Sequence, residues 1–268
     1  MKKRQKWERG LVTGASEGIG EAFARELASR GTDVVLVARR RERLERLAAE
    51  LTAEHGVDIE VLPADLTEPG ALARVEARIE AGAQPIDLLV NNAGGASQQG
   101  PFLELDREQL DRDAYLNSLA LLKLTHAAAG AMASRGHGNV VNVSAGVAFY
   151  PLPGAAAYGA SKAFVNSLSE ALDYELRRSG VRVTAVCPGF TRTDAQRRIG
   201  LNVDRIPAVL WMEPRQVAVA ALRAAARGRS VSSLTRIGAI NAFAGRHLPH
   251  RFWLPRVARL VRQVQPTA

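Results

Sequence analysis

The sequence has little of several residue types, and each scarcity excludes a class of protein. Its 268 residues include one cysteine, Cys187, so no disulfide can form within the chain, and a reducing cytoplasm is the expected compartment. The basic segment 1–9 is not followed by the apolar stretch of a secretory signal, and no apolar run is as long as a membrane-spanning helix. Any membrane contact is therefore expected to be peripheral.

Aromatic residues are also scarce, at 5% of the chain, and no recognised nucleic-acid motif accompanies the basic charge. We therefore expect no nucleic-acid partner. The net charge of +9 favours anionic partners, such as a phosphorylated cofactor, an acidic carrier or a membrane surface. No repeat or linker divides the chain, so we expect one α/β domain over residues 1–268.

Apolar, strand-like runs alternate with helical patterns along the chain. After Leu11 and Val12, such runs occupy residues 34–38, 59–62, 86–90, 140–143, 181–186 and 231–234. The runs are apolar on both faces, as strands are when helices cover both sides of a parallel sheet. This pattern predicts a doubly wound Rossmann fold, in which ligands bind beyond the carboxyl ends of the strands.

The first strand runs into a glycine-rich turn that opens a helix, over residues 11–20. Gly14 permits a tight turn, Gly18 lets the backbone approach a pyrophosphate, and Gly20 lets the helix pack close to its strand. We predict a dinucleotide whose phosphates meet the helix N-terminus. The spacing is not the G-x-G-x-x-G order, and an ordinary glycine-rich turn is the alternative.

Arginines follow the second strand, where a binder of the ribose 2'-hydroxyl would carry Asp or Glu. Arg39 and Arg40 can pair with a 2'-phosphate, which favours NADP over NAD. Asp33 lies about 20 residues beyond the first glycine, as the NAD fingerprint asks, but it precedes the strand and so faces the wrong edge of the sheet. A solvated helix face is the alternative for these arginines, and we expect it for Arg43 and Arg46.

Small and polar residues follow the next strands. Asp65 and Leu66 could contact the adenine, and Asp65 could instead cap the following helix. The segment 91–95 is Asn-Asn-Ala-Gly-Gly, which suits either a close approach to the ribose or a simple turn.

The reactive groups are concentrated between Ser144 and Lys162. Tyr158 and Lys162 lie four residues apart in a helical pattern, which places the phenol and the ammonium on one face. A free tyrosine has a pKa of about 10, and lowering it to neutrality requires about 4 kcal/mol. A lysine alone cannot supply this, so partial burial and an oxidised nicotinamide must contribute. A half-exposed helix surface is the alternative.

Together these motifs resemble the short-chain dehydrogenase/reductase family over roughly residues 9–234. They fall in family order: residues 13–20, Asp65, 91–94, Asn117, Ser144, 158–162, and 188–189 with Thr193. The resemblance implies that Tyr158 is the general acid or base and that Lys162 binds the nicotinamide ribose and lowers the tyrosine pKa. It further implies that Ser144 binds the substrate oxygen and that Asn117 holds a water linked to Lys162. No metal is predicted.

The expected cofactor-binding residues are Gly14, Ser16, Glu17, Gly18, Ile19, Gly20, Arg39, Arg40, Asp65, Leu66, Asn92, Ala93, Gly94, Tyr158, Lys162, Pro188, Gly189 and Thr193. Two features depart from the family pattern. Position 17 is Glu where NADP-preferring members often carry Arg or Lys, and the usual Asp-Gly-Gly ending is absent. A homodimer or a homotetramer is expected.

We therefore expect an NADPH-dependent oxidoreductase that interconverts a carbonyl and a secondary alcohol. The alternative is a non-catalytic NADP(H)-binding regulator on the same fold. Apolar residues after Thr193 suggest a pocket for a lipid-like, acyl or ring substrate, although they could equally seal the core. They are Leu201, Val203, Ile206, Val209, Leu210, Trp211 and Met212.

The C-terminal segment 236–268 is a basic extension that we expect to be helical. From Pro214 to Ala268 the chain has ten arginines and no acidic residue. From Pro255 onward the pattern predicts an amphipathic basic helix. Contact with an anionic membrane surface and packing on a partner subunit or the substrate lid both remain open.

Overall fold

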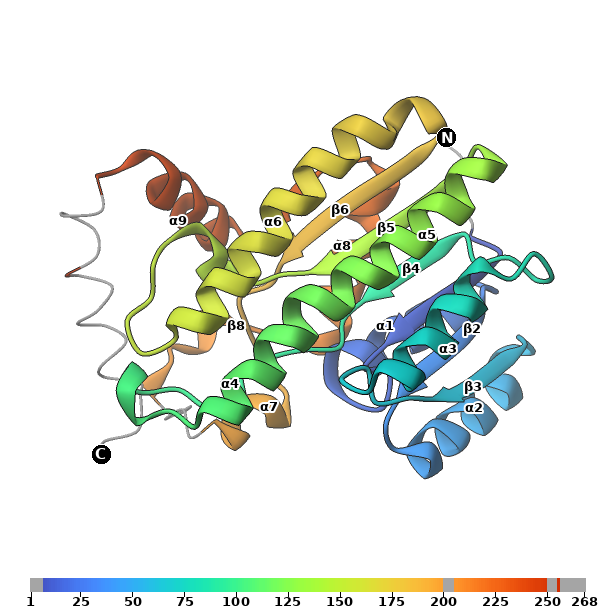
Figure 1. Cartoon of the computed structure of the whole chain (residues 1–268), viewed down its shortest axis with the longest axis horizontal. Coiled ribbons are helices and arrows are strands. Elements are labelled where there is room, and N and C mark those ends of the chain that lie inside the picture. The colour runs from blue at the N-terminus through green and yellow to red at the C-terminus, as the bar shows by residue number, and fades with distance from the viewer. Residues whose placement is uncertain (1–6, 200–204, 250–254, 256–268) are drawn as a thin grey trace.

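The computed structural model describes residues 7–199, 205–249 and 255. Seven strands form one sheet in the order β3-β2-β1-β4-β5-β6-β9, and every pairing is parallel (Figure 1). The strands are β1 (Arg9–Thr13), β2 (Asp33–Ala38), β3 (Ile59–Pro63), β4 (Leu88–Asn91), β5 (Gly138–Val143), β6 (Val181–Cys187) and β9 (Val231–Ser233). The predicted doubly wound Rossmann fold is confirmed.

Each predicted apolar run forms one of these strands, with small differences at the ends. β4 begins at Leu88, two residues later than predicted. Two short strands were not predicted, β7 (Phe190–Thr191) and β8 (Trp211–Met212), which pair with each other in parallel. Two-residue strands are too short to show a hydrophobic period. Their pairing brings together the two ends of the segment that contains the apolar residues predicted to form a substrate pocket.

Helices cover both faces of the sheet. One core cluster joins the strands to α1 (Gly18–Ala28), α2 (Arg41–His55) and α8 (Pro214–Ala226). The other joins them to α3 (Pro69–Glu80), α5 (Leu121–Arg135) and the far end of α6 (Ala156–Leu176), which lie in front of the sheet in Figure 1. In β2, Leu36 belongs to the first cluster and Val35 to the second, which explains why the strands are apolar on both faces.

Three further helices surround the carboxyl ends of the strands. α4 (Arg107–Ala114) continues through a π-helical turn over Tyr115–Ala120 into α5. α7 (Asp194–Arg198) follows β7, and α9 (Arg236–His247) follows β9. A π-helical turn is rare and is often found at functional sites. Here it carries Asn117.

The order of the strands reverses between β1 and β4, so the turns that follow them lie side by side. The hydroxyl of Thr13 accepts hydrogen bonds from the backbone N–H groups of Asn92 and Ala93, each at 2.9 Å. A Cβ atom at Gly20 would overlap the carbonyl of Gly14, so α1 can start this close to the turn only with glycine there. Gly14 itself has a φ of +66°, which favours glycine.

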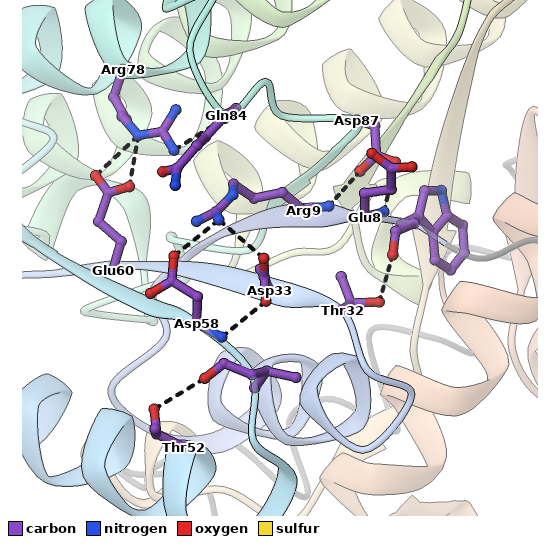
Figure 2. Close-up of polar contacts among 12 residues, drawn as sticks. Glu8, Arg9, Thr32, Asp33, Thr52, Asp58, Glu60, Arg78, Gln84 and Asp87 are labelled. Atoms are coloured by element: carbon purple, nitrogen blue, oxygen red, sulfur yellow. Dashed lines mark hydrogen bonds and ion pairs between the residues drawn. The ribbon is translucent and has the colours of Figure 1, made fainter.

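The amino ends of the strands, which we call the amino edge of the sheet, carry a cluster of ion pairs. They lie opposite the carboxyl ends, or carboxyl edge. Figure 2 shows Arg9 between Asp33 and Asp58, with distances of 3.0 and 2.9 Å from its Nη2 atom. Asp33 also accepts a hydrogen bond from the backbone N–H of Asp58 at 2.9 Å. The prediction that Asp33 faces away from the ligand edge is confirmed.

The C-terminal extension begins as predicted with a helix, α9. The amphipathic helix predicted from Pro255 lies outside the described residues, apart from Pro255 itself, and stays a prediction. Among the residues that the structure describes, no helix is long and apolar enough to cross a membrane.

Candidate active site

A cavity of about 2190 Å³ opens at the carboxyl ends of the strands. Ligand pockets commonly enclose about 300 to 1,000 Å³, so this cavity can hold a dinucleotide together with a substrate. Most of the predicted site residues line it, namely Gly14, Ser16, Glu17, Gly18, Ile19, Arg39, Arg40, Asp65, Leu66, Asn92, Ala93, Gly94, Tyr158, Pro188, Gly189 and Thr193. The other predicted residues, Gly20, Asn117, Ser144 and Lys162, are buried behind its wall.

The glycine-rich turn suits a phosphate group. Gly18 starts α1 with a φ of +60°, and the side chain of the capping residue, Glu17, makes no hydrogen bond to the first turn. The N–H groups at this helix start therefore have no side-chain acceptor, and the positive end of the helix dipole faces the same place. These features fit the pyrophosphate of a dinucleotide.

The Glu17 carboxylate instead forms ion pairs with three arginines. Its Oε2 lies 2.8 Å from Arg40 and 3.3 Å from Arg43, and its Oε1 lies 2.5 Å from Arg198. Burial opposes ionisation, but the hydrogen bonds and charges of Arg198 and Arg40 outweigh it and lower the pKa of Glu17 to about 2. Arg43 is exposed, as predicted for a solvated face, and its place in the first turn of α2 also brings it near Glu17. Arg46 is exposed, as predicted.

Arg39 lies at the rim of the cavity, with 74% of its side chain exposed and its Nη1 3.8 Å from Asp65. The Oδ1 of Asp65 accepts hydrogen bonds from the backbone and hydroxyl of Thr67, and Glu68 is the residue that caps α3. The alternative of Asp65 as a helix cap is therefore wrong. Burial of Asp65 is outweighed by the bonds from Thr67 and the charges of Arg39 and Arg112, which lower the pKa of Asp65.

The three side chains with proton-transfer chemistry meet where β5 and α6 adjoin. The ammonium of Lys162 lies 5.7 Å from the centre of the Tyr158 ring and donates to the carbonyl of Val143 at 3.0 Å. The hydroxyl of Ser144 donates to the backbone carbonyl of Lys162 at 3.0 Å. The helical spacing therefore does bring phenol and ammonium together, and Ser144 joins them through the backbone of α6.

Burial sets the protonation of this group, and for Tyr158 it acts against the expectation that partial burial helps to lower the tyrosine pKa. It raises the pKa of Tyr158 to about 12, with a smaller contribution from Cys187, and it lowers the pKa of Lys162 to about 8. At neutral pH the ligand-free protein therefore holds Tyr158 as a neutral phenol and Lys162 mainly as a cation. A neutral phenol can donate a proton, whereas its use as a base requires additional positive charge.

Asn117 holds the loop that follows β4. Its side-chain amide donates to the carbonyls of Gly95 at 2.6 Å and Asp113 at 2.8 Å, and its Oδ1 accepts from the Gly95 N–H at 2.9 Å. A Cβ atom at Gly94 would lie 2.5 Å from Asn117 Oδ1 and 3.7 Å from the Lys162 ammonium. Glycine at this position therefore lets Asn117 and Lys162 approach the same segment. The water link between them stays a prediction.

Of the apolar residues predicted to form a substrate pocket, some line the cavity and others are buried in the core. Leu201 and Val203 lie outside the described residues. Met212 is buried and does not line the cavity, whereas Val209 is 76% exposed at the cavity wall. Ile206 is buried and also lines the cavity. The segment therefore both seals the core and forms part of an apolar wall.

Several cavity residues were missed by the analysis of the sequence. The thiol of Cys187 lines the cavity and donates to Asn166 Oδ1 at 3.3 Å, and burial raises its pKa to about 11. Ile237 and Asn241 bring one side of α9 to the cavity. Cys187 directly follows the predicted strand 181–186, and this position could have identified it as a site residue. No sequence signal marks Arg198, because its partner Glu17 is 181 residues away.

Comparison with known proteins places this site in context. Residues 9–204 match the family model described as short chain dehydrogenase. A very-long-chain 3-oxoacyl-CoA reductase from Anas platyrhynchos is 36% identical over 189 residues, which are 68% of this chain and 59% of that relative. The match thus spans less than two thirds of the relative's length.

Two solved structures are similar over nearly the whole chain. A short-chain dehydrogenase from Sphingobium yanoikuyae in complex with NADPH is 40% identical, with a TM-score of 0.80 and coverage of 97% of each chain. The bulky-bulky ketone specific alcohol dehydrogenase from Comamonas testosteroni is 34% identical, with a TM-score of 0.77 and coverage of 98% of this chain and 97% of its own. The chain belongs to the short-chain dehydrogenase/reductase family.

Proposed function

We propose that this protein is an NADPH-dependent reductase of a bulky, apolar ketone, with Tyr158 as the general acid. The observation that carries this proposal is the position of Tyr158 at the cavity wall, with the Lys162 ammonium 5.7 Å from the centre of its ring. Ser144, buried beside them, supplies a second hydrogen-bond donor for the substrate oxygen. A binding protein without catalysis would need none of this arrangement.

In the proposed reaction, the bound nicotinamide supplies a hydride to the carbonyl carbon. Tyr158 gives its phenolic proton to the carbonyl oxygen, which becomes the alcohol hydroxyl. Lys162 stabilises the tyrosinate that remains until a proton returns from solvent. Ser144 turns its hydroxyl from the Lys162 carbonyl to the substrate oxygen, where it stabilises the negative charge that develops.

The preference for NADPH rests on Arg39 and Arg40, two cations at one rim of the cavity, and on the NADPH found in the similar Sphingobium structure. The substrate class rests on the apolar wall, on the bulky ketones named for the Comamonas enzyme and on the long acyl chains named for the Anas relative. A ring or lipid-like ketone suits this wall best.

A substrate panel tests the proposal. The purified protein is given NADPH with acyl thioesters, ketosteroids, small ketones and sugars, and the loss of NADPH absorbance is followed together with alcohol formation. We expect turnover with bulky apolar ketones. Turnover confined to sugars would overturn the substrate class, and no turnover with any carbonyl, despite tight NADPH binding, would favour a regulator.

A further inference from the structure

An ion pair at the cavity wall links α7 to the glycine-rich turn. Arg198, in α7, reaches the glycine-rich turn and places its Nη2 2.5 Å from Glu17 Oε1. Both residues line the cavity. The segment before α7 also contacts the turn, because a Cβ atom at Gly18 would lie 3.0 Å from the Cγ2 of Thr193. The chain therefore pairs with the turn at Arg198 and lies close to it at Thr193.

The two oxygens of Glu17 serve different elements. Oε2 forms ion pairs with Arg40 and Arg43 at the start of α2, whereas Oε1 forms an ion pair with Arg198 of α7. Three guanidinium groups around one carboxylate leave a net charge of +2 on this group. If a 2'-phosphate draws Arg40 away, Oε2 loses a partner while Oε1 keeps Arg198. The bridge to α7 therefore does not compete with recognition of the phosphate.

We propose that Glu17 and Arg198 form a clamp that holds the dinucleotide in the cavity, so that release of either nicotinamide cofactor requires this ion pair to open. The proposal rests on the proposed function, since it needs a dinucleotide against the glycine-rich turn. It assigns Glu17 a role that compensates for its departure from the family pattern. Glu17 fastens α7 to the turn, while phosphate recognition is left to Arg39 and Arg40.

The strength of the clamp follows from the exposure of its members. The side chains of Arg198 and Glu17 are 56% and 30% exposed, and exposed ion pairs contribute about 0.2 to 1 kcal/mol. Because 1.4 kcal/mol corresponds to a factor of ten, the upper part of this range corresponds to an approximately two- to fivefold change in rate. Salt screens such pairs, so release from the wild-type protein should become faster as salt is added.

Stopped-flow fluorescence of NADPH and NADH release tests the clamp. We expect Arg198→Ala and Glu17→Gln each to raise the dissociation rate of both cofactors by about two- to fivefold. The double variant should be no faster than the single variants, because the two side chains act as one pair. The salt dependence of NADH release, which involves no 2'-phosphate, should be weaker in Arg198→Ala than in the wild type. Arg41→Ala, which removes an exposed pair with Glu45 outside the cavity, is the matched control and should leave release unchanged.

The outcomes separate the two proposals. A wild-type protein that binds neither cofactor would overturn the proposed function and the clamp together. Normal binding with a release rate that Arg198→Ala does not change would overturn the clamp alone. Multiplicative effects in the double variant would also overturn it, and so would an effect limited to NADPH, since that would assign Arg198 to the 2'-phosphate. An unchanged melting temperature for Arg198→Ala excludes a general loss of structure as the cause.

Discussion

The two edges of the sheet both carry arginine–carboxylate clusters, but the clusters are built differently. At the amino edge, the side chain of Arg9 is 8% exposed, and its two carboxylate partners come from the adjacent strand β2 and the segment just before β3 (Figure 2). At the carboxyl edge, Arg39 is 74% exposed and lies 3.8 Å from Asp65. The amino-edge cluster is built on a buried arginine, whereas the side chains of Arg39, Arg40 and Arg198 at the carboxyl edge are 74%, 42% and 56% exposed.

This difference indicates which charges stabilise the fold and which are available to a ligand. A buried guanidinium must keep its carboxylates, because an unpaired buried charge is strongly unfavourable. An exposed arginine at a cavity rim exchanges partners at little cost, so a phosphate can replace a carboxylate there. Substitutions at the amino edge should therefore change stability, and substitutions at the carboxyl edge should change function.

The largest expected effect is on catalysis at the carboxyl edge. Tyr158→Phe removes the proton donor and should lower kcat by about a thousandfold, within the range of general acid catalysis. The melting temperature and the affinity for NADPH should change little, since the ring stays in place. Steady-state kinetics and fluorescence titration measure the two quantities. Near-normal turnover would contradict the assignment of Tyr158.

The next effect is on stability at the amino edge. Arg9→Ala leaves Asp33 and Asp58 without their shared cation and should lower the free energy of unfolding by about 3 kcal/mol. Both carboxylates are partly exposed, which keeps the loss at the lower end for a buried pair. Urea denaturation measures it, with Arg41→Ala as the exposed control. Turnover per folded molecule should stay normal, and a selective loss of kcat would break the proposed division between the edges.

Lys162→Met should lower activity but raise the free energy of unfolding. Burial lowers the pKa of Lys162 from 10.5 to about 8, which at 1.36 kcal/mol per pH unit corresponds to at most about 3 kcal/mol of destabilisation. This cost is complete below pH 8, shrinks as the pH rises because the unfolded chain binds the additional proton, and vanishes above about pH 10.5.

The methionine variant should thus be catalytically weak but about 1 to 3 kcal/mol more stable than the wild type at pH 7. Denaturation at pH 7 and at pH 10 measures the gain, which should be much smaller at the higher pH. A variant less stable than the wild type at pH 7 would show that the Lys162 side chain contributes net stability there, for example through its bond to Val143.

The smallest effect concerns the choice of cofactor. Arg39→Ala should raise the KM for NADPH about tenfold, which is 1.4 kcal/mol, while the KM for NADH changes less than twofold. The reason is that only NADPH carries the 2'-phosphate. Arg46→Ala, which removes an exposed arginine of α2, serves as the control. Equal changes for both cofactors would place Arg39 at a part of the dinucleotide that the two share.

The alternation of apolar runs and helical patterns was sufficient to predict the fold. β2 illustrates why, because its alternate residues enter opposite core clusters and so require apolar side chains on both faces. Tyr158 and Lys162 were predictable for a similar reason, since helical spacing alone brings residues four apart onto one side. The position of Asp33 also followed from the order of the chain, because a residue before a parallel strand lies at the amino edge.

Contacts between segments far apart in the sequence were decided only by the tertiary structure. Local patterns predict the start of α1, but they do not predict that Glu17 meets Arg198 across 181 residues. The same holds for Arg43, an exposed arginine that also contacts Glu17 because α2 starts beside the glycine-rich turn. Periodicity and spacing act within one element, whereas charge pairing across a cavity depends on the packing of several elements.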